Sequence, residues 1–89
     1  MIIEAIVTCY CLKGLMANGN PVSQGSVACP QSLEIGRSVE IGGKRYICTD
    51  RMAKQYRKGN YFDIWDKDCN VCKKFGRQKI KIKIWDVLD

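Results

Sequence analysis

The alternation of apolar and polar side chains along the chain predicts a series of short strands. Residues 79–84 read Lys-Ile-Lys-Ile-Lys-Ile, an alternation that places isoleucines on one face of a strand and lysines on the other. The pair Gly42-Gly43 separates two further runs and predicts a two-residue hairpin. The predicted strands cover residues 2–10, 26–29, 38–41, 44–49, 61–65 and 77–87.

Two segments between these strands carry helical signals. Residues 66–75 predict a short helix, with Asp66 as its N-cap and Gly76 as its C-terminal stop. Residues 51–58 predict one or two helical turns. Six short strands with one or two short helices indicate a mainly β protein, built as a small closed barrel. At 89 residues, without repeats or linkers, the chain is expected to form one domain, residues 1–89.

The formal net charge of +6 indicates that the binding partner is anionic. A cationic surface attracts nucleic acids, anionic membranes and anionic cell-wall polymers. The sequence has no zinc-finger spacing, basic helix or aromatic-interleaved basic stripe, so nucleic acid is not the expected partner. The lysines of residues 79–84 are interpreted as a solvated face that discourages pairing along a sheet edge. No apolar run is long enough to span a membrane.

Two aspartates are the candidate chemical groups. The chain has no histidine, so any acid–base chemistry must use a carboxyl group. Asp50 and Asp63 each lie at or near the end of an apolar, strand-forming run, where apolar neighbours raise the pKa of a carboxyl group. An aspartate at a strand end also serves simply to cap a turn. The residues alone leave both roles open.

The collinear order of several short motifs resembles the three-aspartate (3D) domain. That domain is a six-stranded double-psi β-barrel, found in the C-terminal part of membrane-bound lytic transglycosylase A and related to rare lipoprotein A and expansins. The resemblance runs from about residue 6 to about residue 84 and suits a small, phage-encoded protein. The matching residues are Thr8-Cys9-Tyr10, Met16-Ala17-Asn18-Gly19, Gly25-Ser26-Val27-Ala28, Pro30, Leu33-Glu34-Ile35-Gly36, Val39, Thr49-Asp50, Phe62-Asp63-Ile64 and Phe75-Gly76.

The resemblance implies a function for the two aspartates. Asp63 matches the catalytic acid of the lytic transglycosylases, which cleave the bond between N-acetylmuramic acid and N-acetylglucosamine and leave a 1,6-anhydro product. Asp50 matches the aspartate that opens a glycine-rich segment of the family, whereas this chain continues with Arg51-Met52-Ala53. The family's third aspartate falls at Lys67, with an aspartate on either side. A non-catalytic module that binds wall polysaccharide, or a structural part of a phage particle, is the alternative function.

Three further residues are candidates for substrate binding. The resemblance places Thr8 and Tyr10 near the groove, where they would hydrogen-bond or stack on sugar; packing on the barrel rim is the alternative. Trp65 is either a sugar platform or a core residue.

The implied partner is peptidoglycan or another anionic wall polysaccharide, with other phage proteins as further partners. The start of the chain lacks a basic segment and Glu4 interrupts its apolar run, so no signal peptide is expected. The expected location is the producing cell's cytoplasm or a phage particle, with action on the periplasm or cell wall.

The six cysteines permit three interpretations. They form disulfides, which would support a small barrel, or they remain buried thiols, which fits a chain without an export signal. In the third, a structural zinc would bind the four thiolates of Cys9, Cys11, Cys69 and Cys72. No cofactor is expected otherwise.

Overall fold

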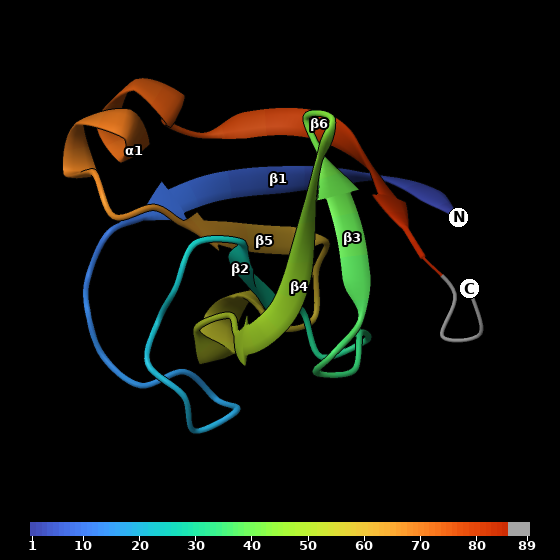
Figure 1. Ribbon diagram of the computed structural model, residues 1–89. Coiled ribbons are helices and arrows are strands. Elements are labelled where there is room, and N and C mark those ends of the chain that lie inside the picture. Colours follow the sequence, from blue (N-terminus) through green and yellow to red (C-terminus); the bar gives the residue numbers. More distant parts are fainter. Residues whose placement is uncertain (86–89) are drawn as a thin grey trace.

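Six strands close into a barrel in the computed structural model, which describes residues 1–85 (Figure 1). Around the barrel the strands follow the order β1-β5-β2-β4-β3-β6. A 3₁₀ turn, Lys54–Tyr56, follows β4, and the helix α1, Cys69–Phe75, precedes β6. The strands are β1 (Ile2–Tyr10), β2 (Ser26–Cys29), β3 (Ser38–Ile41), β4 (Lys44–Arg51), β5 (Tyr61–Trp65) and β6 (Gln78–Ile84).

The strand pairing confirms the predicted fold class. β1 pairs in parallel with β5, and β2 pairs in parallel with β4, while the remaining neighbours are antiparallel. This mainly β, six-stranded arrangement with short helices is the double-psi β-barrel expected from the sequence. Parallel neighbours cannot be joined by a hairpin, and in both parallel pairs other strands intervene along the chain.

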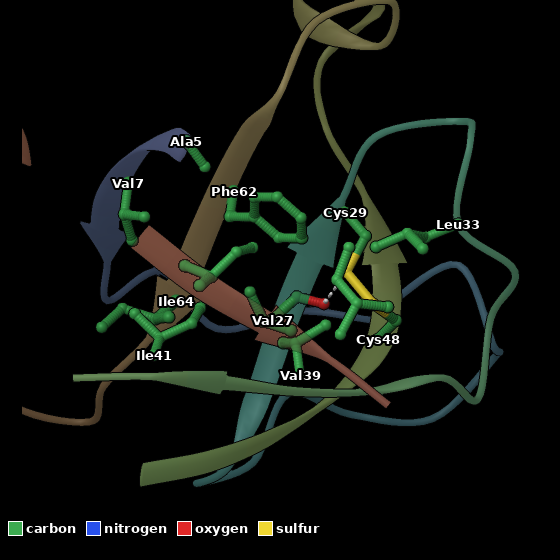
Figure 2. Close-up of a cluster of buried hydrophobic side chains, with 12 residues drawn as sticks. Ala5, Val7, Val27, Cys29, Leu33, Val39, Ile41, Cys48, Phe62 and Ile64 are labelled. Atoms are coloured by element: carbon green, nitrogen blue, oxygen red, sulfur yellow. Dashed lines mark hydrogen bonds between the residues drawn. A yellow bond between two sulfur atoms is a disulfide. The ribbon is translucent and has the colours of Figure 1, made fainter. Parts of the chain in front are cut away.

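The interior of the barrel is filled by alternate residues of all six strands (Figure 2). Phe62 and Ile64 of β5 point inward, as do Ile82 and Ile84 of β6, and Phe62 is fully buried. Because side chains alternate along a strand, the residue between Phe62 and Ile64 must point outward. The hydrophobic core therefore places Asp63 on the outer wall of the barrel.

The local turn and cap predictions are largely confirmed. Gly42 and Gly43 have φ values of 59° and 80°, the left-handed pair that a type I′ hairpin turn requires. Gly76 ends α1, as predicted. The N-cap is Asp68 rather than Asp66, because the Asp68 side chain accepts a hydrogen bond from the Asn70 N–H. The last part of the strand predicted at 77–87 lies beyond the described residues.

All six cysteines are paired. The disulfides join Cys9 to Cys72, Cys11 to Cys69 and Cys29 to Cys48. The first two connect the end of β1 to α1, and the third lies in the core (Figure 2). The interpretation as reduced thiols is therefore wrong, and no thiolate remains to bind zinc. Within residues 1–85 no group of three metal-ligating acidic, cysteine or histidine side chains occurs.

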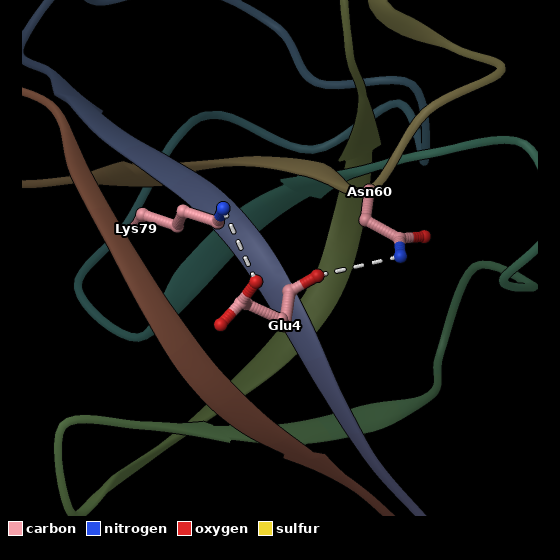
Figure 3. Close-up of polar contacts among 3 residues, drawn as sticks. All are labelled: Glu4, Asn60 and Lys79. Atoms are coloured by element: carbon pink, nitrogen blue, oxygen red, sulfur yellow. Dashed lines mark hydrogen bonds and ion pairs between the residues drawn. The ribbon is translucent and has the colours of Figure 1, made fainter.

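Polar contacts on the outside of β1 hold the start of β5 (Figure 3). Lys79 Nζ lies 3.3 Å from Glu4 Oε1, and Asn60 Nδ2 donates to the Glu4 carbonyl at 3.4 Å. The Ile6 N–H donates to the Asn60 carbonyl at 2.9 Å. An exposed ion pair contributes only about 0–1 kcal/mol, so the backbone bond matters more. It fixes the register in which Tyr61 lies beside Ile6.

The lysine face of β6 does not protect a sheet edge. The isoleucines point inward and the lysines outward, as predicted. However, β6 pairs with both β1 and β3, so closure of the barrel leaves it no free edge. The lysines therefore contribute positive charge to the surface rather than edge protection. No helix of the described part of the chain is long and apolar enough to cross a membrane.

Candidate functional site

One row of side chains crosses four strands on the outer wall of the barrel. Thr8 of β1 pairs with Asp63 of β5, Asp63 with Ala28 of β2, and Ala28 with Asp50 of β4. Register partners point to the same side of a sheet. The row therefore gathers both predicted aspartates and the predicted threonine on one surface.

A bulge in β4 brings Asp50 into this row. Val27 pairs with Cys48, but the next residue of β2, Ala28, pairs with Asp50, so Thr49 is the extra residue. Without the bulge, Asp50 would be the partner of a β2 residue whose side chain lies in the core. Bulges commonly redirect a side chain in this way beside functional sites. Here the bulge turns Asp50 outward, toward the aspartate of β5.

The environment of Asp63 favours its protonated form. Its carboxyl group is half-buried, and burial raises its pKa above the usual value. The Thr8 hydroxyl donates a hydrogen bond to Asp63 Oδ1 at 2.9 Å and lowers the pKa, while the negative charge of Asp50 raises it. The net shift is upward. A carboxyl group in this state can donate a proton at a higher pH than an exposed aspartate.

Asp50 acts on Asp63 through its charge. Its Oδ1 accepts hydrogen bonds from the backbone N–H of Ala17 at 2.9 Å and of Arg51 at 2.8 Å. The first bond fastens the β1–β2 segment to β4. No direct hydrogen bond joins Asp50 to Asp63 among the described residues, where Ala28 lies between them. Asp50 is thus both an anchor for the loop and a fixed negative charge beside Asp63.

Tyr10 places a phenol next to the two aspartates. Its hydroxyl oxygen is buried and has no hydrogen-bond partner of good geometry within residues 1–85. It lies near enough to Asp50 for that carboxylate to act on its pKa. Burial, followed by the charges of Asp50 and Asp63, raises the pKa of Tyr10 to about 12. The hydroxyl therefore keeps its proton throughout the physiological pH range.

A pocket of about 190 Å³ opens on the other side of Asp63. We call it the acid pocket; its walls include Thr8, Met52, Tyr56, Tyr61, Asp63 and Arg77. The rings of Tyr56 and Tyr61 are 5.1 Å apart between centroids, and the Arg77 guanidinium lies 6.0 Å from the Tyr61 ring centre. The pocket thus combines one acid, one cation and two tyrosine rings.

Sequence reasoning overlooked the two tyrosines and the arginine. Tyr61 lies two residues before Asp63, so strand alternation alone would have placed both on one face. No pattern points to Tyr56 or Arg77, which come from the 3₁₀ turn and from the link between α1 and β6. Gly59 also contributes, because a Cβ there would lie 2.5 Å from Tyr61 Cε2. A glycine at this position lets the Tyr61 ring approach the backbone closely.

Trp65 is buried and does not line the acid pocket. Its side chain is only 7% exposed, and its indole N–H donates to the Leu12 carbonyl at 2.9 Å. A sugar platform needs an open ring face, so this placement favours the core role that the sequence left as an alternative. Trp65 instead fastens the β1–β2 segment at Leu12.

Asp66 and Asp68, on either side of Lys67, accept hydrogen bonds from groups of the protein itself. Asp66 Oδ1 accepts from the Asp68 N–H at 2.8 Å, and its Oδ2 accepts from the Gln24 side chain at 3.3 Å. Asp68 caps α1. Neither side chain lines the acid pocket. The third aspartate of the resembling family therefore has no counterpart beside Asp63.

Comparisons with known proteins support the architecture. No protein-family model matches the sequence, and no curated protein matches it. Among solved structures, the Streptomyces papain inhibitor (SPI) is similar, with a TM-score of 0.68 and 20% sequence identity. The match covers 97% of this chain and 96% of that chain. At this identity the likeness shows a shared barrel fold and nothing about function.

Proposed function

We propose that this chain is a three-aspartate-type barrel that cleaves peptidoglycan as a lytic transglycosylase, with Asp63 as its acid and base. The observation that carries the proposal is the half-buried Asp63 carboxyl, whose pKa is raised by burial and by Asp50, at the edge of an aromatic pocket. A proton donor of this kind beside sugar-sized space is what glycosidic bond cleavage requires. The row of side chains across β1, β5, β2 and β4 also contains Thr8, Asp63 and Asp50. The resemblance to the three-aspartate domain indicates the same three residues.

In the proposed reaction a single carboxyl group serves twice. Asp63 donates its proton to the glycosidic oxygen as the bond from that oxygen to the anomeric carbon of N-acetylmuramic acid breaks. The resulting carboxylate then accepts the proton of the sugar's own 6-hydroxyl as that oxygen bonds to the anomeric carbon. The product is a 1,6-anhydro sugar, and no water is consumed. Burial and the charge of Asp50 hold the pKa of Asp63 up.

The proposed substrate and location agree with the surface and the disulfides. The net charge of +6 favours an anionic wall polymer. Three disulfides persist in oxidising surroundings, which fits action at the cell wall by a protein made in the cytoplasm or carried by a phage particle.

Product analysis of digested peptidoglycan tests this function. Purified wall is incubated with the protein, and the soluble fragments are analysed by mass spectrometry. We expect fragments that end in 1,6-anhydro-N-acetylmuramic acid, which are lighter by one water than hydrolysis products. Fragments with reducing ends alone would indicate a hydrolase, and wall binding without any fragments would indicate a non-catalytic binding module.

A second candidate function, peptidase inhibition, rests on the β1–β2 segment. Leu12 and Leu15 are 76% and 75% exposed, although the backbone that carries them is firmly held. The Cys11–Cys69 disulfide, the Trp65 hydrogen bond to Leu12 and the bridge between Leu15 and Pro21 hold it in place. Rigid loops with exposed apolar side chains bind protein clefts at low entropic cost. The similar solved structure is a papain inhibitor.

An inhibition assay separates the two candidates. If the loop is inhibitory, the protein slows a papain-type cysteine peptidase at stoichiometric concentration, and the variant Leu12→Asp/Leu15→Asp loses that effect. Asp63→Asn would keep it, because Asp63 lies outside the loop. An unchanged peptidase rate at excess protein would remove this candidate.

A further inference from the structure

We infer that one outer face of the barrel docks on the surface of an anionic lipid bilayer. The start of β1, the end of β6 and the hairpin of β3 and β4 form this face, which we call the β6 face (Figure 1). It shares no residue with the walls of the acid pocket, and the inference does not depend on the proposed function. The side chains that carry it are Ile2, Arg45, Ile47, Lys81, Lys83 and Trp85.

The register of the barrel gathers cations on the β6 face. Lys83 of β6 pairs with Ile2 of β1 on one side and with Glu40 of β3 on the other. Glu40 pairs in turn with Arg45 of β4. Register partners point to the same side of a sheet, and Lys81, two residues before Lys83, points to that side as well. Three basic side chains therefore lie on one surface.

Apolar side chains protrude among these cations. Ile2 is 68% exposed and Ile47 is 47% exposed. Ile47 lies two residues after Arg45 in β4, so both point outward. A soluble polyanion needs only cations, whereas a surface that lies on a bilayer combines cations with apolar side chains that enter the headgroup region. The combination therefore favours a lipid surface as the partner.

The cations of the β6 face are not neutralised within the described part of the molecule. Glu40 lies between Lys83 and Arg45 in the register, but it forms an ion pair with neither within residues 1–85. Instead, Lys83 Nζ lies 4.1 Å and Arg45 Cζ 4.6 Å from the centre of the Trp85 ring, which are cation–π distances. Tryptophan and basic side chains are the residues that proteins place at the level of lipid headgroups.

A pocket of about 290 Å³ on this face offers a place for one headgroup. Lys81 and Lys83 line it, together with Ile2 and the turn at Gly42-Gly43. Glu40 also lines it, so two cations oppose one acid. Because the two ammonium groups attract phosphate and Ile2 offers apolar contact beside them, the pocket matches a phosphate that is attached to an apolar chain.

Binding to vesicles of defined composition tests the inference. The protein is mixed with vesicles of phosphatidylcholine alone, or of an equal mixture of phosphatidylcholine and phosphatidylglycerol, and bound protein is separated by sedimentation. We expect binding to the mixed vesicles alone, and less of it at high salt, which screens surface charge. Trp85 fluorescence should shift to shorter wavelength on binding, whereas Trp65 is already buried. Absence of binding to the mixed vesicles would overturn the inference.

A charge variant locates the binding surface. Lys81→Gln/Lys83→Gln is expected to weaken vesicle binding about 25-fold, or about fivefold for each charge removed. Lys73→Gln/Lys74→Gln removes two exposed charges from α1 and is the matched control, which should keep most of the parent's affinity. Equal losses in the two variants would show that net charge alone drives binding, and the β6 face would then have no special role.

An apolar variant separates a bilayer from a soluble polyanion. Ile2→Ser/Ile47→Ser keeps every charge and should bind the mixed vesicles about tenfold more weakly than the parent does. It should still bind soluble polyphosphate as the parent does, which also shows that it is folded. If this variant keeps the full affinity for vesicles, the face binds polyanions through charge alone and the inference of a lipid partner fails.

Discussion

Asp63→Asn is expected to lower the rate of anhydro-fragment release about 10²- to 10⁴-fold, the range of general acid–base catalysis. Asparagine keeps the shape of the side chain and the oxygen that accepts the Thr8 hydroxyl bond, but it cannot donate a proton to a leaving oxygen. The rate is measured as soluble fragments released from purified wall per unit time. Asp68→Asn, which changes an acid at the start of α1 outside the pocket, is the matched control and retains the rate. A rate unchanged in Asp63→Asn would exclude the proposed role.

The same variant should fold at least as stably as the parent protein at neutral pH. The folded-state pKa of Asp63 is raised, so the folded state binds its proton more tightly than the unfolded state does. Asp63 therefore costs no stability below the ordinary aspartate pKa of about 3.9, and the cost grows as pH rises through the folded-state pKa. Thermal unfolding of Asp63→Asn and the parent protein should differ least in acid and most near neutral pH. If Asp63→Asn loses activity but keeps its stability, the loss of activity comes from the missing proton donor and not from unfolding.

Removal of both disulfides between β1 and α1 is expected to destabilise the fold by about 4 kcal/mol, since each closes a long loop. Their sequence separations are 63 and 58 residues. Once one bridge is present, the other closes only the few residues between them. Loss of the Cys11–Cys69 bridge alone, through Cys11→Ser/Cys69→Ser, should therefore cost much less than loss of both. Denaturant unfolding of the double and quadruple variants measures this difference.

Full reduction should unfold the protein at physiological temperature. The buried Cys29–Cys48 bridge spans 19 residues and adds about 3 kcal/mol in the same loop-entropy treatment. The combined loss approaches the whole stability of a typical small domain, about 5–15 kcal/mol. Circular dichroism with and without a reductant follows the transition. A reduced chain that melts at the same temperature as the oxidised one would show that the core alone holds the barrel.

Most of the fold could be predicted from the sequence, because the local signals for strands, turns and helix ends agree with one another. The alternation in β6, the glycine pair of the hairpin and the helix stop at Gly76 each act within a few residues. The cysteine pairing was not accessible in this way, because it depends on the end of β1 lying beside α1. Spacing along the chain does not contain that information.

The candidate site was only partly predictable for the same reason. Asp63, Thr8 and Tyr10 follow from strand alternation and the family resemblance. The convergence of Asp50 with Asp63 depends on the bulge at Thr49, for which the sequence has no marker. Arg77 directly precedes β6, and the pairing of β6 with β1 places it in the wall of the acid pocket. Its role therefore depends on the closed barrel and cannot be predicted from the local sequence.

The titration of the Asp63 carboxyl group tests the central claim most directly. Protein with carbon-13-labelled aspartate is followed by NMR across the acid and neutral pH range, alongside Asp50→Asn, which removes the neighbouring charge but keeps the oxygen that accepts the Ala17 N–H. We expect Asp63 to titrate above the reference aspartate value of about 3.9, and to titrate lower in Asp50→Asn than in the parent protein. A parent Asp63 that titrates at or below the reference value would contradict its role as a proton donor.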